Sequence, residues 1–357
     1  MNIKLLFLLT FLFIFPYNGI SETSISETDN IDIDQPTKIY RSFGTILPLT
    51  GKYSRLGERS LRGIRTAVEH TDQFGNYHVF VKDSKSTAEG ASKAYTQLTS
   101  EINPLFVVGP VPSNHVEAIE KSNPIINQPV AIFPIIENKT HRKNIVSFYL
   151  PIDSQVKTLV DFSLRDLKLK RFAVLSPDTG VGKMYSDKFS SYLKRNTGKI
   201  VYRGSYNPDL SDLDTHIKWI ESYKVDAIFI PDSAKNSTFV IKNIISDDDI
   251  TNVIFLGPNT WNSEIFYNLS KDDFDGIVHK IVFTDFIDKN SEDWINFSNL
   301  YKTLFNEKPG SYEYQVYLAT LYFLENDLRR EIVSSNNTLI PKAYILTIND
   351  GRIVRLK

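Results

Sequence analysis

The sequence predicts an α/β protein with two doubly wound lobes, each built on a parallel sheet that helices cover on both faces. The first observation is an almost unbroken alternation of short apolar strand patterns and helical patterns after residue 38. The second is that this alternation restarts after Pro151. The third is residues 43–63, where an apolar strand runs through a glycine-punctuated loop into an amphipathic helix. This order of elements implies parallel strands.

The N-terminal region predicts export. Lys4 supplies a basic start, residues 5–15 form an apolar run that contains a single polar residue, Thr10, and Pro16 breaks that run. Residues 1–21 therefore have the pattern of a secretory signal peptide, with a retained membrane anchor as the alternative. Residues 22–38 are acidic and polar, and we expect them to form a disordered lead-in.

The first lobe begins with the strand at residues 43–47, which Pro48 ends. Gly51, Gly57 and Gly63 then recur six residues apart. We expect the backbone to turn at the first two glycines and a helix to pack closely on the sheet at the third. A helix that starts just after Gly57 would direct its unpaired N–H groups above the strand end, which suits an anion. Further elements are expected at residues 79–82 (strand), 87–99 (helix), 105–108 (strand), 114–121 (helix) and 130–136 (strand).

The second lobe follows the same order of elements. They are expected at residues 154–167 (helix), 172–175 (strand), 183–196 (helix), 200–204 (strand), 212–223 (helix), 227–231 (strand), 237–246 (helix), 253–256 (strand) and 277–283 (strand). The loop at residues 177–182 predicts a turn with positive φ at glycine, and a cation or amine site at Asp178 is the alternative. Two aromatic helical patterns follow, and Asn349-Asp350-Gly351 between two alternating runs predicts a terminal β-hairpin. We place the first lobe at residues 39–150 plus about 286–335, and the second at 151–285 plus about 336–357.

Composition excludes several classes of function. The 357 residues contain no cysteine, which excludes disulfides, thiol nucleophiles and an acylated N-terminal cysteine. The 41 basic and 42 acidic residues nearly balance without a basic run, so nucleic acid is not an expected partner. Ser113 with nearby His115 is the strongest catalytic candidate, but no nucleophile elbow, P-loop or paired-histidine motif is present. We therefore expect no enzyme activity, metal or cofactor.

Several segments resemble a known family. They are ILPLTGKYSRLGERSLRGIRTAVE (46–69), KDSKSTAEGASKAYTQL (82–98), VVGPVPSN (107–114) and AVLSPDTGVGKMYSDKF (173–189). These segments resemble type I periplasmic binding proteins, in particular the leucine/isoleucine/valine-binding branch. The resemblance implies two lobes joined by three crossovers, with a small ligand buried between them when they close.

A narrower likeness lies in VDAIFIPDSAKN (225–236), FLGPNTWNSEIF (255–266) and the terminal LTINDGRIV. These segments are similar to bacterial penicillin-binding protein activators, whose binding-protein-like domain associates with peptidoglycan synthases. The best-known activators are lipoproteins with an added helical domain, and this chain has neither the cysteine nor the extra length.

The resemblance also implies ligand-binding residues. Those of the first lobe are Tyr53, Ser54, Arg55, Leu56, Ser113, Asn114, Glu137 and Asn138. Loops at the carboxyl ends of second-lobe strands add Asp232, Ser233, Asn259 and Trp261, of which Trp261 could stack on an apolar or sugar-like group. The alternatives are helix capping for Ser113 and Asn114, a solvated carboxylate for Glu137, and a core position for Trp261.

Two departures from the family pattern bear on the ligand. Ile136 and Glu137 stand where amino-acid binders offer a small residue and a threonine, so an α-carboxylate would meet a like charge. Val181 stands where the family has an aromatic residue, so a stacking contact is lost.

The expected function is an exported, periplasmic solute-binding protein, soluble and monomeric, that serves an ABC-type transport system. Its partners would be an amino-acid-like or related polar small molecule and a membrane permease. The alternative is an interaction protein with a degenerate cleft that activates a cell-wall synthase. Loss of the family's residues at 136, 137 and 181 favours the second hypothesis, and the breadth of the resemblance favours the first.

Overall fold

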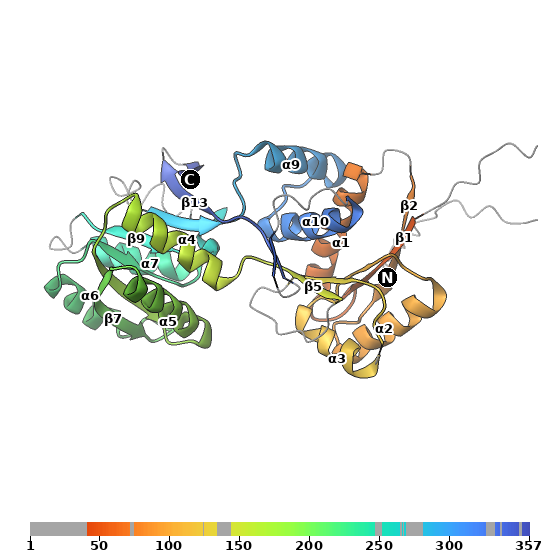
Figure 1. Ribbon diagram of the computed structural model, residues 1–357, viewed down its shortest axis with the longest axis horizontal. Coiled ribbons are helices and arrows are strands. Elements are labelled where there is room, and N and C mark those ends of the chain that lie inside the picture. The colour runs from red at the N-terminus through yellow and green to blue at the C-terminus, as the bar shows by residue number, and fades with distance from the viewer. Residues whose placement is uncertain are drawn as a thin grey trace, which may run out of the picture. The chain divides into compact units, whose positions relative to one another are not determined.

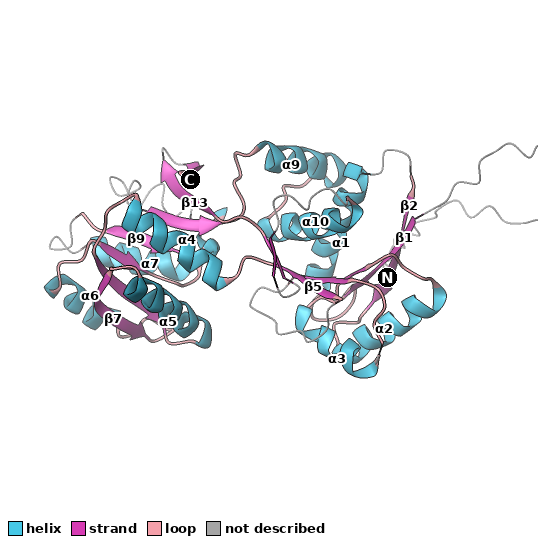
Figure 2. Ribbon diagram, viewed as in Figure 1, coloured by secondary structure: helices cyan, strands magenta, loops and turns pink. Residues whose placement is uncertain are grey.

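The computed structural model describes residues 41–71, 75–123, 125–133, 144–246, 252–264, 266, 268, 281–325, 333–335, 338–349 and 352–357. Within them the chain forms two sheets, each with helices on both faces (Figures 1 and 2). The predicted fold class is therefore confirmed. The expected signal peptide and acidic lead-in lie outside the described residues.

The first sheet has the strand order β11-β12-β5-β4-β3-β1-β2. All neighbouring pairs described are parallel except the β11–β12 hairpin at one edge. Its strands are β1 (Arg41–Leu47), β2 (Tyr77–Asp83), β3 (Val107–Val108), β4 (Val130–Ile132), β5 (Ile145–Phe148), β11 (Val333–Ser335) and β12 (Thr338–Ile340). Its helices are α1 (Ser54–Thr71), α2 (Ala88–Glu101), η1 (Ser113–His115), α3 (Val116–Ser122), α9 (Glu292–Phe305) and α10 (Ser311–Leu324).

The second sheet has the order β14-β13-β10-β9-β8-β6-β7, with β13 and β14 antiparallel at one edge. Its strands are β6 (Arg171–Pro177), β7 (Lys199–Tyr206), β8 (Ala227–Phe229), β9 (Ile254–Gly257), β10 (Ile281–Asp285), β13 (Tyr344–Asn349) and β14 (Arg352–Arg355). Its helices are α4 (Ile152–Arg165), α5 (Gly180–Arg195), α6 (Leu213–Ser222), α7 (Ala234–Ile245) and η2 (Asn259–Trp261). The β13–β14 pair is the predicted terminal hairpin.

Each sheet separates two apolar layers because neighbouring strand residues point to opposite faces. In β1, Phe43 and Leu47 pack with α1, α9 and α10, whereas Ile46 packs with α2 and α3. In β6, Leu175 packs with α6 and α7, whereas Val174 packs with α4 and α5. The alternation in the sequence therefore determines which helices cover which face.

The chain passes between the two sheets three times: after β5, after β10 and after β12. The third passage corrects the expected lobe boundary. Because β12 pairs with β5, residues 338–340 belong to the first sheet, and the chain returns to the second only after Ile340.

The glycines of the first βα unit also correct the sequence prediction. Helix α1 begins at Ser54, so Gly57 lies inside the helix and only Gly51 has a positive φ, of 85°. A Cβ on Gly57 would lie 2.3 Å from the carbonyl oxygen of Pro48, and one on Gly63 would lie 2.7 Å from that of Glu313. Gly57 therefore permits helix–loop contact, and Gly63 lets α1 pack on α10, a helix and not the sheet.

Candidate functional site

A pocket of about 210 Å³ lies at the carboxyl edge of the second sheet. Four prolines line it, and each lies at the end of a parallel strand or within two residues after it: Pro177, Pro208, Pro231 and Pro258. The remaining lining residues are Thr179, Val181, Gly182, Tyr185, Asp232, Ser233, Asn236 and Thr260. This edge is where ligands bind in open α/β sheets, because the loops that follow the strands converge there.

The first turn of α5 forms one side of the pocket. Thr179 is the N-cap of this helix, and its side chain accepts a hydrogen bond from the N–H of Gly182 at 3.0 Å. Neither Gly180 nor Gly182 has a positive φ, so the expected glycine turn is wrong. A Cβ on Gly182 would lie 2.3 Å from the carbonyl oxygen of Pro177. Glycine is needed here because the helix starts against the end of β6.

Asp232 is the acidic side chain of the pocket, and it is held in place by its neighbours. Tyr206 Oη donates to its Oδ2 at 2.7 Å, and the side-chain amide of Asn236 donates to the same oxygen at 3.2 Å. The N–H of Ser233 donates to Oδ1 at 2.6 Å. Burial, followed by the nearby carboxylate, raises the pKa of Tyr206, so this phenol remains a hydrogen-bond donor.

Ser233 lines the pocket and is also the N-cap of α7, where its Oγ accepts from the N–H of Asn236 at 3.2 Å. On the neighbouring loop, Thr260 Oγ1 donates to the backbone carbonyl of Asp232 at 2.7 Å. The loops after β8 and β9 are therefore joined directly. Asp232 and Ser233 thus lie together at the predicted edge.

Asn259 does not line the pocket, but its backbone is hydrogen-bonded to Gln155, a side chain that supports this loop. Its N–H donates to the Oε1 atom of Gln155 at 3.0 Å, and Tyr185 Oη donates to the same atom at 3.1 Å. The Nε2 atom of Gln155 donates to the carbonyl of Leu150 at 3.1 Å. Gln155 is 3% exposed, so this side chain connects α4, α5 and the loop after β9 inside the lobe.

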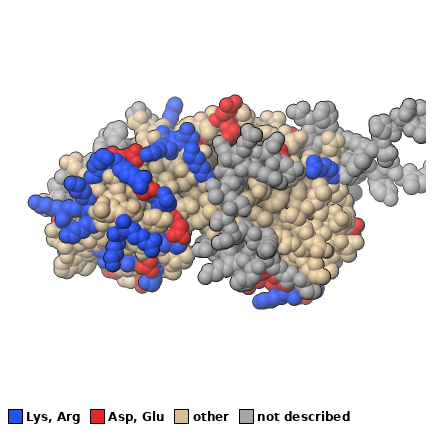
Figure 3. Space-filling model, viewed as in Figure 1, with Lys and Arg blue, Asp and Glu red and all other residues tan. Residues whose placement is uncertain are grey.

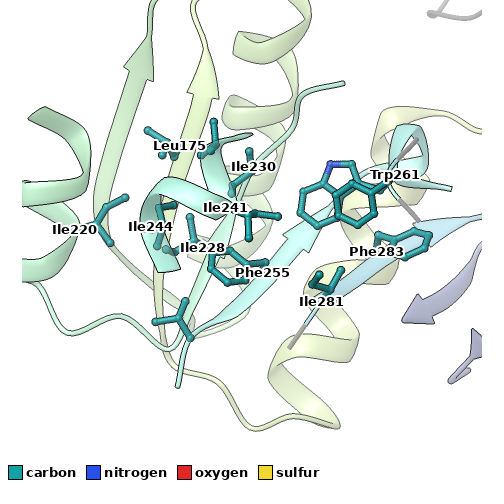
Figure 4. Packing of buried hydrophobic residues seen from close by; sticks show 14 of the residues in the cluster. Leu175, Ile220, Ile228, Ile230, Ile241, Ile244, Phe255, Trp261, Ile281 and Phe283 are labelled. Carbon is teal, nitrogen blue, oxygen red and sulfur yellow. The ribbon is translucent and has the colours of Figure 1, made fainter. Parts of the chain in front are cut away.

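The proposed stacking of Trp261 on a ligand is wrong in this structure, because its side chain is fully buried. Its ring stacks on Phe266 with centroids 4.6 Å apart, and Nε1 donates to Ser237 Oγ at 2.9 Å. Figure 4 shows the indole beside Phe283 in the apolar cluster of the second lobe. The alternative of a core residue that braces its loop is the one observed.

In the first lobe, the loop between β1 and α1 is tied to the loop after β2. Asp83 Oδ1 accepts from the N–H groups of Leu49 and Lys85 at 2.9 and 2.8 Å, and its Oδ2 accepts from Thr50 Oγ1 at 2.6 Å. Burial would raise the pKa of Asp83, but these hydrogen bonds outweigh it and hold the pKa below its ordinary value. Ser86 adds a second link, because its Oγ accepts from the N–H of Tyr53 at 2.9 Å.

In the first lobe, Tyr53 lies beside the η1 segment. The ring centroids of Tyr53 and His115 lie 6.4 Å apart in an edge-on arrangement. Ser113 and Asn114 are the first residues of η1 and are not helix N-caps, since Pro112 and His115 occupy those positions. The capping alternative is therefore wrong. Burial lowers the pKa of His115.

The other first-lobe predictions are placed as follows. Ser54 opens α1, Arg55 is exposed, and Leu56 is half-buried against the apolar cluster of that lobe. Glu137 and Asn138 lie outside the described residues, as does Ile136.

Sequence reasoning missed Thr179, Tyr206, Asn236 and Thr260. Thr179 and Thr260 carried a usable signal, because each follows a parallel strand by two or three residues, as Asp232 does. Tyr206 carried none, since a tyrosine at the end of a strand is most often core.

Within the described parts of the chain, no group of three or more His, Asp or Glu side chains could hold a metal ion. The helices described there include none long and apolar enough to cross a membrane.

Comparison with known proteins agrees with this architecture. A family model described as periplasmic binding protein matches residues 42–326. The chain belongs to the periplasmic binding protein family. The Leu/Ile/Val-binding protein BraC3 of Rhizobium johnstonii is 25% identical over 255 residues, which cover 64% of this chain and 67% of that protein.

Solved structures of other periplasmic binding proteins show the same fold. A putative branched-chain amino acid ABC transporter protein from Rhodospirillum rubrum matches with a TM-score of 0.75 and 14% identity, over 89% of this chain and 100% of that one. The substrate-binding protein LivJ from Streptococcus pneumoniae, in complex with isoleucine, matches with a TM-score of 0.59 and 16% identity, over 89% and 99%. None of these three proteins is described as a penicillin-binding protein activator, so that narrower likeness stays a prediction.

Proposed function

We propose that this chain is the exported, periplasmic solute receptor of an ABC-type importer and that it binds an amino-acid-like ligand. The observation that carries the proposal is the pocket at the carboxyl edge of the second sheet, in a member of the periplasmic binding protein family. The Rhizobium relative is named as a Leu/Ile/Val-binding protein, and the Streptococcus structure is described as a complex with isoleucine; both support an amino-acid ligand.

The charges around the pocket suit a zwitterion. The carboxylate of Asp232 lines it and would attract an ammonium group. The first turn of α5 lines it too, at Thr179, Val181 and Gly182, and the N-terminus of a helix favours a carboxylate. An α-amino acid carries both charges on adjacent groups.

The size of the pocket also favours a small ligand. Its volume of about 210 Å³ is below the roughly 300–1,000 Å³ of sites that hold drug-sized molecules. The half-buried first-lobe loop at Tyr53 and Ser54 would supply the second set of contacts when the lobes close.

The test is a binding screen with the chain lacking residues 1–21. Leucine, isoleucine, valine, polar amino acids and benzoate are compared by thermal shift and then by calorimetry. A ligand at one hundred times its dissociation constant should stabilise the protein by about 2.7 kcal/mol. Asp232→Asn removes the charge that would attract an ammonium group, and affinity should fall by roughly 10- to 150-fold.

Asp214→Asn is the matched control, because Asp214 is exposed on α6 and does not line the pocket. This variant should bind like the wild type. Absence of a shift with every amino acid, in a sample shown to be folded, would contradict the proposal.

A second candidate function rests on Val181. This side chain is 37% exposed at the pocket, where the resemblance predicts an aromatic residue. A cleft without that contact fits the alternative of a monomeric interaction protein that binds a cell-wall synthase, as penicillin-binding protein activators do. The transport proposal predicts a membrane permease as the protein partner instead. Co-purification with either partner, at equal expression, distinguishes the two.

A further inference from the structure

Basic residues gather at the amino edge of the second sheet, opposite the edge that carries the pocket. Lys170 precedes β6, Lys199 begins β7 and Lys224 lies three residues before β8. The N–H of Lys199 donates to the carbonyl of Lys170 at 2.9 Å. The guanidinium of Arg171 donates to the carbonyls of Lys224 and Tyr223 at 2.8 and 2.5 Å. These hydrogen bonds place the three strand starts side by side.

Most of these charges are not neutralised. Six cationic side chains of this edge form no salt bridge with any other described residue: Lys168, Lys170, Lys194, Arg195, Lys199 and Lys224. Lys168 and Lys170 line a hollow of about 460 Å³, and Lys194 and Arg195 form the last turn of α5, just before β7. Figure 3 shows Lys and Arg side chains concentrated over this lobe, whose elements are labelled in Figure 1.

The described carboxylates at this edge are already engaged. Asp226 accepts from the N–H groups of Lys170 and Arg171 at 2.7 and 2.8 Å, and Asp166 pairs with Lys357 at 2.9 Å. The aspartates at residues 247–249 lie outside the described residues, so this comparison of charges at the edge does not include them. The described residues of this edge therefore carry a net positive charge, in a chain whose formal charge is −1.

Two exposed aromatic side chains adjoin the cations. Trp219 and Tyr223 are one helical turn apart at the end of α6, and they are 53% and 37% exposed. The ring of Tyr223 stacks on Tyr202 of β7 at 6.0 Å, and its carbonyl receives the hydrogen bond from Arg171. The other two tryptophans, Trp261 and Trp294, are buried.

We propose that this edge, defined by the six cations with Trp219 and Tyr223, docks the protein on an anionic membrane surface. Lys and Arg attract lipid phosphates, and the amphipathic rings of Trp and Tyr favour the headgroup level. A free phosphate would use the cations but leave the exposed indole without a role. Docking at this edge leaves the opposite edge, with the pocket, accessible. The proposal goes beyond the proposed function and does not depend on it.

Vesicle sedimentation tests the proposal. The chain lacking residues 1–21 is used, because the apolar run at residues 5–15 could itself bind lipid and residues 40–357 form one compact unit. Vesicles contain either phosphatidylcholine alone or equal parts of phosphatidylcholine and phosphatidylglycerol. We expect binding to the acidic vesicles only, and its loss at high salt, because salt screens exposed charges.

The variant that tests the cations combines Lys170→Gln, Lys199→Gln and Lys224→Gln. Each charge removed should weaken binding about fivefold, so the triple variant should lose roughly a hundredfold in affinity. The matched control, Lys93→Gln with Lys121→Gln and Lys308→Gln, removes the same charge from exposed positions on the first lobe. Equal binding by the two triple variants would overturn the proposal.

Fluorescence reports the aromatic contact directly. Binding to acidic vesicles should shift the emission of Trp219 to shorter wavelength, and brominated lipid should quench it. Trp219→Phe should abolish both signals, since the two remaining tryptophans are buried. Absence of vesicle binding, or binding with unshifted and unquenched emission, contradicts docking at this edge and leaves an acidic protein as the partner to test.

Discussion

Trp261 and Trp219 are the same residue type in one lobe, but their surroundings give opposite predictions for mutation. Trp261 is fully buried against Phe266 and donates to Ser237, whereas Trp219 is 53% exposed. Trp261→Ala should lower the free energy of unfolding by about 3–5 kcal/mol, because it leaves a large cavity. Trp219→Ala should change it by no more than about 0.5 kcal/mol. Urea denaturation followed by circular dichroism measures both, and similar losses in the two variants would contradict this assignment.

Asp285, at the end of β10, predicts a dependence of stability on pH. Burial raises its pKa to about 7, although hydrogen bonds from Asn262 and from the N–H of Phe286 and the charge of Lys289 oppose the rise. Between about pH 4 and pH 7 the native carboxyl keeps a proton that the unfolded chain has lost, so its contribution to stability falls as pH rises. Asp285→Asn removes this dependence.

The measurement is the urea midpoint of wild type and Asp285→Asn across that pH range. The variant should gain stability relative to the wild type as the pH rises from about 4 to about 8. The amide of Asn262 donates to both Asp285 and Ile287, so Asn262→Ala is a useful comparison that disturbs the same site without removing the titrating group. A constant difference between wild type and Asp285→Asn at every pH would show that the pKa of Asp285 is the same in the folded and unfolded states, and would contradict the raised pKa.

At the residue scale, the sequence predicted where the candidate site residues lie better than what each side chain does. Asp232 and Ser233 could be placed at the carboxyl edge because they come within four residues of the end of a strong apolar strand, and they line the pocket. Trp261 belongs to a loop at the same edge, but its burial depends on Phe266 and Phe283, which come from other segments. Gln155 is far from the pocket loops in sequence and reaches them only through the packing of α4. No local pattern contains that information.

Among the elements, the contact of α1 with α10 gives the sharpest prediction. A Cβ on Gly63 would lie 2.7 Å from the backbone oxygen of Glu313 and 3.1 Å from Val316 Cβ. Gly63→Ala should therefore destabilise the protein by about 1–3 kcal/mol, because neither backbone can move without disturbing the core.

Gly180→Ala is the control for that prediction. Nothing lies within 4 Å of a Cβ at Gly180, and its φ is not positive. This variant should be neutral or gain up to about 1 kcal/mol, because alanine restricts the unfolded chain. Thermal unfolding of both variants measures the difference, and a Gly63→Ala variant as stable as Gly180→Ala would show that the two helices are not held this closely.

The elements best predicted from sequence were those with a clear period and a chemical boundary. Helix α2 was expected to begin at residue 87, and Thr87 is its N-cap, accepting from the N–H of Gly90. Strand β5 was missed because four residues carry little periodicity. The β11–β12 hairpin was missed for a different reason: β12 is held by pairing with β5, about 190 residues earlier in the chain.

At the scale of the whole molecule, the order of elements predicted two sheets, but it did not determine where the chain finally returns to the second. That point depends on which strand residues 338–340 pair with. β12 pairs with β5 of the first sheet, whereas β13 pairs with β10 of the second. Both strands are short and apolar, so the sequence alone does not distinguish their sheets. The sheet that each strand joins matters, because the segment between β12 and β13 is the third connection about which the lobes would move.

The proposed function predicts that ligand changes the shape of the whole molecule. A ligand that contacts both lobes at once gains the second set of contacts only when they close, so it favours the closed state by its differential affinity. Shifting the population from 1:99 to 99:1 needs a preference of about 10⁴-fold. Small-angle scattering should therefore show a smaller radius of gyration with saturating ligand. Asp232→Asn should show the same decrease only at a higher ligand concentration, because the variant loses affinity but keeps the hinge. Calorimetric binding without any change in scattering would show that the pocket of the second lobe holds the ligand alone, and would contradict closure without contradicting binding.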